Sequence, residues 1–182
     1  MTTVTTMPLT GDWTADDLDA LPDDGFRYEL VDGVLLVSPS PAAPHQIGLA
    51  GLLFALHAAA PPHVRVLPAP LDIRFSPTRQ LQPDIVVIPR VTPSGPKVTD
   101  LPLLAVEVLS PSTRATDLTL KRHVFEQAGV PSYWLLDTEI PSLTVLELTG
   151  GVYVEVATVA GDEPFTAQRP FPVTVVPADL LR

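Results

Sequence analysis

The chain contains an apolar run, Leu103-Leu104-Ala105-Val106-Glu107-Val108-Leu109, that a single acid interrupts. A shorter run, Asp84-Ile85-Val86-Val87-Ile88, has the same character and begins with an acid. Near-continuous apolar runs of this length are typical of central strands that are covered on both faces. We therefore predict that these two segments are neighbouring strands at the centre of a sheet.

Helices and strands are predicted on both sides of these runs. Thr14 to Asp17 has the spacing of a capping box and opens a short helix that ends near Pro22. Asp32-Gly33 joins two short strands into a hairpin. The periodicity predicts helices over 45–60 and 114–128, and strands over 28–31, 34–37, 63–67, 71–75, 133–137, 143–148 and 151–158. This order indicates an α/β (α+β) fold with a mixed central β-sheet flanked by helices, in one domain over 1–182.

The composition limits the class of protein. The 182 residues are 46% apolar and 18% charged, which is enough for a hydrophobic core, and the lack of cysteine excludes disulfides and thiolate metal sites. No apolar run reaches the ~20 residues of a membrane span, and residues 1–10 lack a signal-peptide pattern. We expect a soluble, cytoplasmic protein with no membrane partner. The net charge of −10 argues against strong nonspecific binding to a phosphate backbone.

Three acids interrupt apolar patterns: Glu29, Asp84 and Glu107. An ionised carboxylate in a buried strand costs several kcal/mol unless a cation or a metal pairs with it. Asp84 and Glu107 lie toward the ends of neighbouring predicted strands, so one divalent ion can bridge them. The alternatives are an exposed position on an edge strand for Glu29 and a turn position after Pro83 for Asp84.

Lys121 is the fourth polar residue at a position that favours an apolar one. It follows Leu118 and precedes Phe125 at helical spacing, which places it on or beside the stripe that faces the core. A lysine there either extends to solvent or meets an acid, and Asp117 is a local partner four residues earlier. Alone, such a lysine is usually solvated, whereas beside two acids it favours a site for a hard metal ion.

Several motifs occur in order between Tyr28 and Asp137: Tyr28-Glu29-Leu30-Val31-Asp32-Gly33, Ser38-Pro39-Ser40-Pro41 with His45, Gln82-Pro83-Asp84-Ile85, Glu107-Val108-Leu109-Ser110-Pro111-Ser112-Thr113, Asp117 with Lys121, and Gly129-Val130-Pro131-Ser132-Tyr133-Trp134. With these motifs the chain resembles the Uma-two family of restriction endonuclease-like proteins. Asp84 and Glu107 are also similar to the acids of the PD-(D/E)XK nuclease pattern.

The resemblance implies a restriction endonuclease-like core over 28–137. In it, Asp84, Glu107 and Val108 form the site for Mg²⁺, with Mn²⁺ as a substitute, and Glu29 is an accessory acid. The general pattern has a lysine two residues after Glu107, where this chain has Leu109. Lys121 is the candidate that supplies the ammonium instead. The implied catalytic set is therefore Asp84, Glu107, Lys121 and Glu29, and a homodimer is expected.

These observations predict a metal-dependent endonuclease that hydrolyses phosphodiester bonds of DNA. A non-catalytic interaction module on the same fold and a metal-dependent hydrolase of smaller phosphoesters remain the alternatives. The acidic net charge opposes a DNA substrate, although seven basic residues in the middle of the chain allow a local basic groove: Arg74, Arg79, Arg90, Lys97, Arg114, Lys121 and Arg122. His45 is either a site residue or a local hydrogen-bond partner at a helix start. The other histidines, at 57, 63 and 123, lack ligand spacing.

Overall fold

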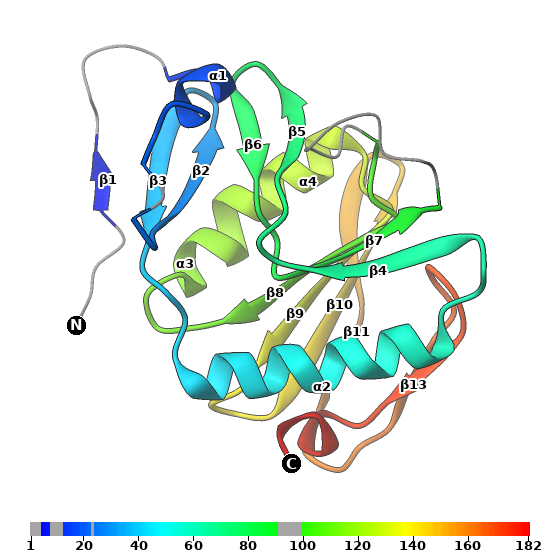
Figure 1. Cartoon of the computed structure of the whole chain (residues 1–182). Helices are drawn as coiled ribbons and strands as arrows, with labels where there is room; N and C mark the ends of the chain where they lie inside the picture. Colours follow the sequence, from blue (N-terminus) through cyan, green and yellow to red (C-terminus); the bar gives the residue numbers. More distant parts are fainter. Residues whose placement is uncertain (1–4, 8–12, 23, 91–99) are drawn as a thin grey trace.

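The central sheet has six strands in the order β11-β10-β9-β8-β7-β4 (Figure 1). The structure is a computed structural model that describes residues 5–7, 13–22, 24–90 and 100–182. The strands are β4 (Val64–Pro68), β7 (Ile85–Pro89), β8 (Leu104–Leu109), β9 (Ser132–Asp137), β10 (Ser142–Thr149) and β11 (Val152–Ala160). Only β8 and β9 run parallel among these neighbours, so the sheet is mixed. β7 and β8 are adjacent, which confirms the prediction from their apolar runs.

The two faces of β8 explain its near-continuous apolar sequence. Alternate residues such as Val106 and Val108 pack against Leu52 and Leu56 of helix α2 (Ala43–Ala59). The residues that alternate with them, such as Ala105 and Leu109, pack in a second cluster with Val124 and Phe125 of helix α4 (Arg122–Ala128). Every residue of β8 is buried because a helix layer covers each face.

A second, antiparallel sheet has the strand order β1-β3-β2-β6-β5. Its strands are β1 (Thr5–Met7), β2 (Arg27–Val31), β3 (Val34–Ser38), β5 (Ile73–Ser76) and β6 (Arg79–Leu81). Asp32 and Gly33 both have positive φ, as a two-residue hairpin turn requires, so the predicted hairpin of β2 and β3 is confirmed. Val31 and Leu81 pack against the α4 side of the central sheet, which brings β2 close to β8.

The segment between β8 and β9 differs from the regular helix that the sequence predicts. It consists of α3 (Arg114–Thr116), a π-helical turn η1 (Asp117–Lys121) and α4, which ends at Gly129 with a φ of 83°. The wider turn changes the inward face, so that Asp117 is buried and Leu118 is 39% exposed. The prediction that Leu118 faces the core is therefore wrong, whereas Phe125 is buried as predicted and Lys121 is buried rather than extended to solvent.

The shortest elements differ in how well the sequence predicts them. Helix α1 (Ala15–Leu18) begins at the predicted capping box of Thr14 and Asp17. β1 and β6 were missed, as were β12 (Phe165–Ala167), β13 (Val173–Val175) and the 3₁₀ helix η2 (Pro177–Leu181). Among the described helices, none has the length and apolar character needed to cross a membrane.

Candidate active site

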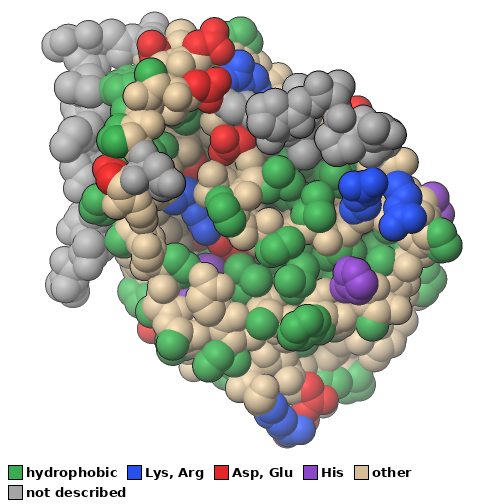
Figure 2. Space-filling model, viewed as in Figure 1, with side chains coloured by type: hydrophobic (Ala, Val, Ile, Leu, Met, Phe, Trp, Pro, Cys, Tyr) green, Lys and Arg blue, Asp and Glu red, His purple; other side chains and the backbone are tan. Residues whose placement is uncertain are grey.

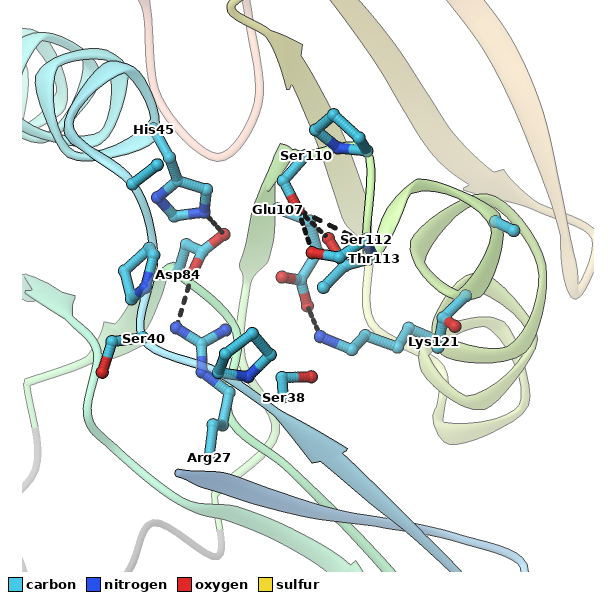
Figure 3. A pocket seen from close by; sticks show the side chains of 16 residues that line it. Arg27, Ser38, Ser40, His45, Asp84, Glu107, Ser110, Ser112, Thr113 and Lys121 are labelled. Atoms are coloured by element: carbon cyan, nitrogen blue, oxygen red, sulfur yellow. Dashed lines mark hydrogen bonds and ion pairs between the residues drawn. The ribbon is translucent and has the colours of Figure 1, made fainter. Parts of the chain in front are cut away.

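A cavity of about 660 Å³ opens beside the end of the central sheet where β7 begins and β8 finishes. Two loops form much of its wall, residues 38–42 before α2 and residues 110–113 after β8, and both are rich in proline and hydroxyl side chains. The charged and titratable side chains that line it are Arg27, His45, Asp84, Glu107 and Lys121 (Figure 3).

Asp84 and Glu107 are brought together by the register of β7 and β8. The antiparallel ladder pairs Ile85 with Val106. One step further along the ladder, Asp84 lies opposite Glu107, and opposed residues of antiparallel strands project from the same face. Both acids are buried. The neighbouring positions inferred from the two broken apolar runs are thus present in the fold.

Three protein groups hold the carboxylate of Asp84. Its Oδ2 accepts hydrogen bonds from the backbone N–H of Val108 at 2.8 Å and from Nε2 of His45 at 3.1 Å. Its Oδ1 accepts one from Nη2 of Arg27 at 2.9 Å. Burial raises the pKa of Asp84, but the hydrogen bond from His45 and the charge of Arg27 outweigh burial and hold that pKa well below its usual range. Asp84 is therefore ionised. His45 bonds to this distant residue, 39 positions away in the sequence, rather than to a neighbour at the start of its own helix.

Lys121 lies in a triangle of carboxylates. Its Nζ is 2.9 Å from Oε2 of Glu29, and 3.2 Å from both Oε1 of Glu107 and Oδ1 of Asp117. The ammonium donates a hydrogen bond to Glu107, whereas Oδ1 of Asp117 lies at ion-pair distance without a hydrogen-bond partner among the described residues. Burial lowers the pKa of Lys121, but these three charges outweigh burial and raise it well above its ordinary value. The lysine stays charged although only 2% of it is exposed.

Glu29 is buried, so the alternative of an exposed edge-strand residue is wrong. Its Oε1 accepts a hydrogen bond from the backbone N–H of Gln82 at 2.9 Å, while Oε2 contacts Lys121. Both oxygens are thus committed, and Glu29 is not among the described residues that line the cavity. Its place in the fold is that of a residue that positions the ammonium.

The buried charges around the cavity do not balance. Four carboxylates, those of Glu29, Asp84, Glu107 and Asp117, stand against the two cations Lys121 and Arg27, which leaves an excess of two negative charges when all are ionised. Burial raises the pKa of Glu107 well above its ordinary value; Lys121 opposes this rise, and the other three acids add to it. A divalent cation would remove the excess.

The donor set also fits a hard cation such as Mg²⁺. Two opposed carboxylates supply oxygen ligands, and Val108 has only a backbone carbonyl to offer because its side chain is apolar and buried. No three Asp, Glu, His or Cys side chains in the described part of the chain form a complete metal-ligand set. Mg²⁺ does not need one, since it commonly binds one or two carboxylates and keeps several waters.

Arg27 was not recognised in the sequence as a contributor to this site, and Asp117 was recognised only as a local partner of Lys121. Arg27 stands two residues before Glu29, the spacing that places both on one face of β2, and this alternation was the available signal. The burial of Asp117 depends on the π-helical turn, which has no simple pattern. Of the seven basic residues proposed for a groove, only Lys121 lines the cavity; Lys97 lies outside the described residues. The histidines at 57, 63 and 123 are exposed.

The sequence matches the Uma2 family, described as "Putative restriction endonuclease", over residues 15–179. The chain belongs to this family. Among solved structures, the Uma2 chain is similar to one titled as a putative nuclease belonging to DUF820 from Anabaena variabilis. The two are 21% identical with a TM-score of 0.70, covering 92% of this chain and 97% of the other. This likeness shows a shared fold. No curated protein matches the chain in sequence.

Proposed function

We propose that this Uma2 protein is a metal-dependent endonuclease that hydrolyses phosphodiester bonds of DNA, with Mg²⁺ as its ion and Mn²⁺ as a substitute. The observation that supports this function best is the placement of opposed Asp84 and Glu107 carboxylates beside the buried ammonium of Lys121 in one cavity. The family description, a restriction endonuclease, agrees with a nuclease.

The proposed roles follow from the geometry. Asp84, Glu107 and the carbonyl of Val108 would hold the ion, which when bound stabilises charge on the phosphate and activates water. Lys121 stands 3.2 Å from Glu107, and the N–H that now points to this carboxylate would donate to a phosphate oxygen as negative charge develops there. Glu29 and Asp117 keep the ammonium in place. Lys121 thereby replaces the lysine of the general pattern, whose position is occupied by buried Leu109.

A plasmid assay tests this function and separates it from the alternatives. We expect supercoiled DNA to be nicked in Mg²⁺ or Mn²⁺ and to stay intact in EDTA, because the carboxylate pair needs the ion to approach a phosphate. Cleavage of bis(p-nitrophenyl) phosphate without nicking would indicate a hydrolase of smaller phosphoesters. Metal binding without cleavage of either substrate would indicate an interaction module.

We also propose a homodimer, and helix α2 offers a surface for it. The helix has no Asp, Glu, Lys or Arg, and it exposes Ile47 and Phe54, the latter to 71%. Figure 2 shows hydrophobic side chains over the part of the surface where α2 lies. Two copies of a −10 chain repel each other less across a helix without charged side chains than across an acidic face.

Light scattering at micromolar concentration tests this dimer. We expect the mass of two chains for the wild type, and of one chain for Phe54→Glu, because the new charge would be buried in the contact. His57→Glu, at another exposed position of the helix, is a control for added charge. A wild-type monomer at tens of micromolar would contradict the proposal.

A further inference from the structure

We propose that Arg27 occupies the place of the metal ion in the metal-free protein and turns to a substrate phosphate once the ion binds Asp84. This inference rests on the proposed function and adds a residue to it. Arg27 is the cation of the cavity that contacts Asp84 directly, at 2.9 Å from Nη2 to Oδ1.

The two oxygens of Asp84 have different surroundings. Oδ2 accepts from the Val108 N–H, a backbone group of strand β8, and from the buried side chain of His45 near the start of helix α2. Within the described residues, Oδ1 accepts only from the Arg27 side chain. Figure 3 shows Arg27 and His45 approaching Asp84 from different sides. The framework therefore fixes Oδ2, and Oδ1 is the oxygen that a metal ion would take.

Arg27 and a divalent ion cannot both occupy Oδ1. A guanidinium and a metal ion at one carboxylate oxygen repel each other strongly in a partly buried site. The side chain of Arg27 is 18% exposed and lines the cavity, so it has space into which it can move. Its backbone is fixed in β2, so the displaced guanidinium remains within the cavity.

Lys121 cannot act in this way. Its side chain is 3% exposed, and two of its three partners, Glu29 and Asp117, lie outside the proposed metal pair. It therefore keeps its position when an ion binds. The cavity thus has one fixed cation and one displaceable cation, and the displaceable one has the planar fork that binds phosphate oxygens in pairs.

The direction in which the Mn²⁺ affinity changes when Arg27 is substituted tests this inference. Arg27→Met keeps an apolar stem and removes the competing charge, so its affinity for Mn²⁺ without DNA should rise roughly tenfold or more, since a charge-assisted hydrogen bond no longer has to be broken. Calorimetry or the electron paramagnetic resonance signal of free Mn²⁺ measures this. Binding to a short DNA duplex is measured in Ca²⁺ so that the DNA is bound without being cleaved. The affinity of Arg27→Met for this duplex should be lower than that of the wild type. Arg169→Met, which breaks an ion pair with Glu147 and does not line the cavity, should change neither property.

If Arg27 only holds Asp84 in place, Arg27→Met should bind Mn²⁺ more weakly than the wild type, because Asp84 would no longer be held in position. Unchanged or weaker Mn²⁺ binding in Arg27→Met would therefore overturn the inference. If Arg27→Met does not fold, the same measurements are made on Arg27→Gln, which keeps a neutral hydrogen-bond donor near Oδ1. Absence of Mn²⁺ binding by the wild type would instead reject the proposed function. Wild-type binding and cleavage without the gain in Arg27→Met would reject the role of Arg27 alone.

Discussion

Replacing Lys121 with methionine should abolish cleavage and lower the free energy of unfolding by about 3–5 kcal/mol. The substitution keeps the volume of the side chain but leaves Glu29, Glu107 and Asp117 buried without their common cation. Urea denaturation measures the loss of stability, and the plasmid assay measures the loss of activity. Added Mg²⁺ should restore part of the stability, because the ion replaces some of the missing positive charge.

A second variant separates the structural role of Lys121 from its role in hydrolysis. Combining Lys121→Met with Glu29→Gln and Asp117→Asn removes the two carboxylates that hold the ammonium outside the proposed metal pair. Stability should largely return, whereas cleavage should not. Arg169→Met, which breaks a more exposed pair with Glu147, should cost at most about 1 kcal/mol. Cleavage that survives in folded Lys121→Met would contradict the assignment.

Asp84→Asn and Glu107→Gln should each remove detectable Mn²⁺ binding and reduce cleavage on the order of 10³-fold, the scale of several kcal/mol of metal assistance. Their effects on stability should differ. Asp84→Asn weakens the contacts with Arg27 and His45 and should destabilise the fold. Glu107→Gln removes one charge from a crowded group of acids, so stability should be unchanged or higher.

Calorimetry with Mn²⁺ and thermal melts of both variants test these expectations together. Asp137→Asn is a matched control, since Asp137 pairs with Arg114 and does not line the cavity. Unchanged Mn²⁺ affinity in both Asp84→Asn and Glu107→Gln would leave the acids with a structural role only.

The sequence predicted the centre of the site because burial and charge conflict there. Asp84 and Glu107 stood out against apolar strands, and their proximity then followed from the pairing of β7 with β8. The position of Lys121 among acids followed from helical spacing and from Asp117 four residues before it. The mixed sheet and its flanking helices followed from the order of the elements.

The remaining parts depend on contacts that no local pattern encodes. Arg27 and His45 meet Asp84 across 57 and 39 residues, and neither disturbs the pattern of its own element. Strands β6, β12 and β13 have three residues each, too few to show alternation. Leu118 was misplaced because helical spacing assumes 3.6 residues per turn, which the π-helical turn does not have.

The π-helical turn makes the site sensitive to the length of the chain at one place. Such a turn holds about one residue more than an α-helical turn. If the same residues wound as a regular α-helix, helix α4 would be rotated by about one residue's step, roughly 100°, relative to α3. Either the ammonium or the Val124–Phe125 pair would then leave the interior. The exposed positions Leu118 and Leu120 accept other side chains, but the number of residues and the winding must change together here. Among relatives, a one-residue gap in this segment would therefore mark chains whose helix winds regularly, with the lysine three residues after the aspartate.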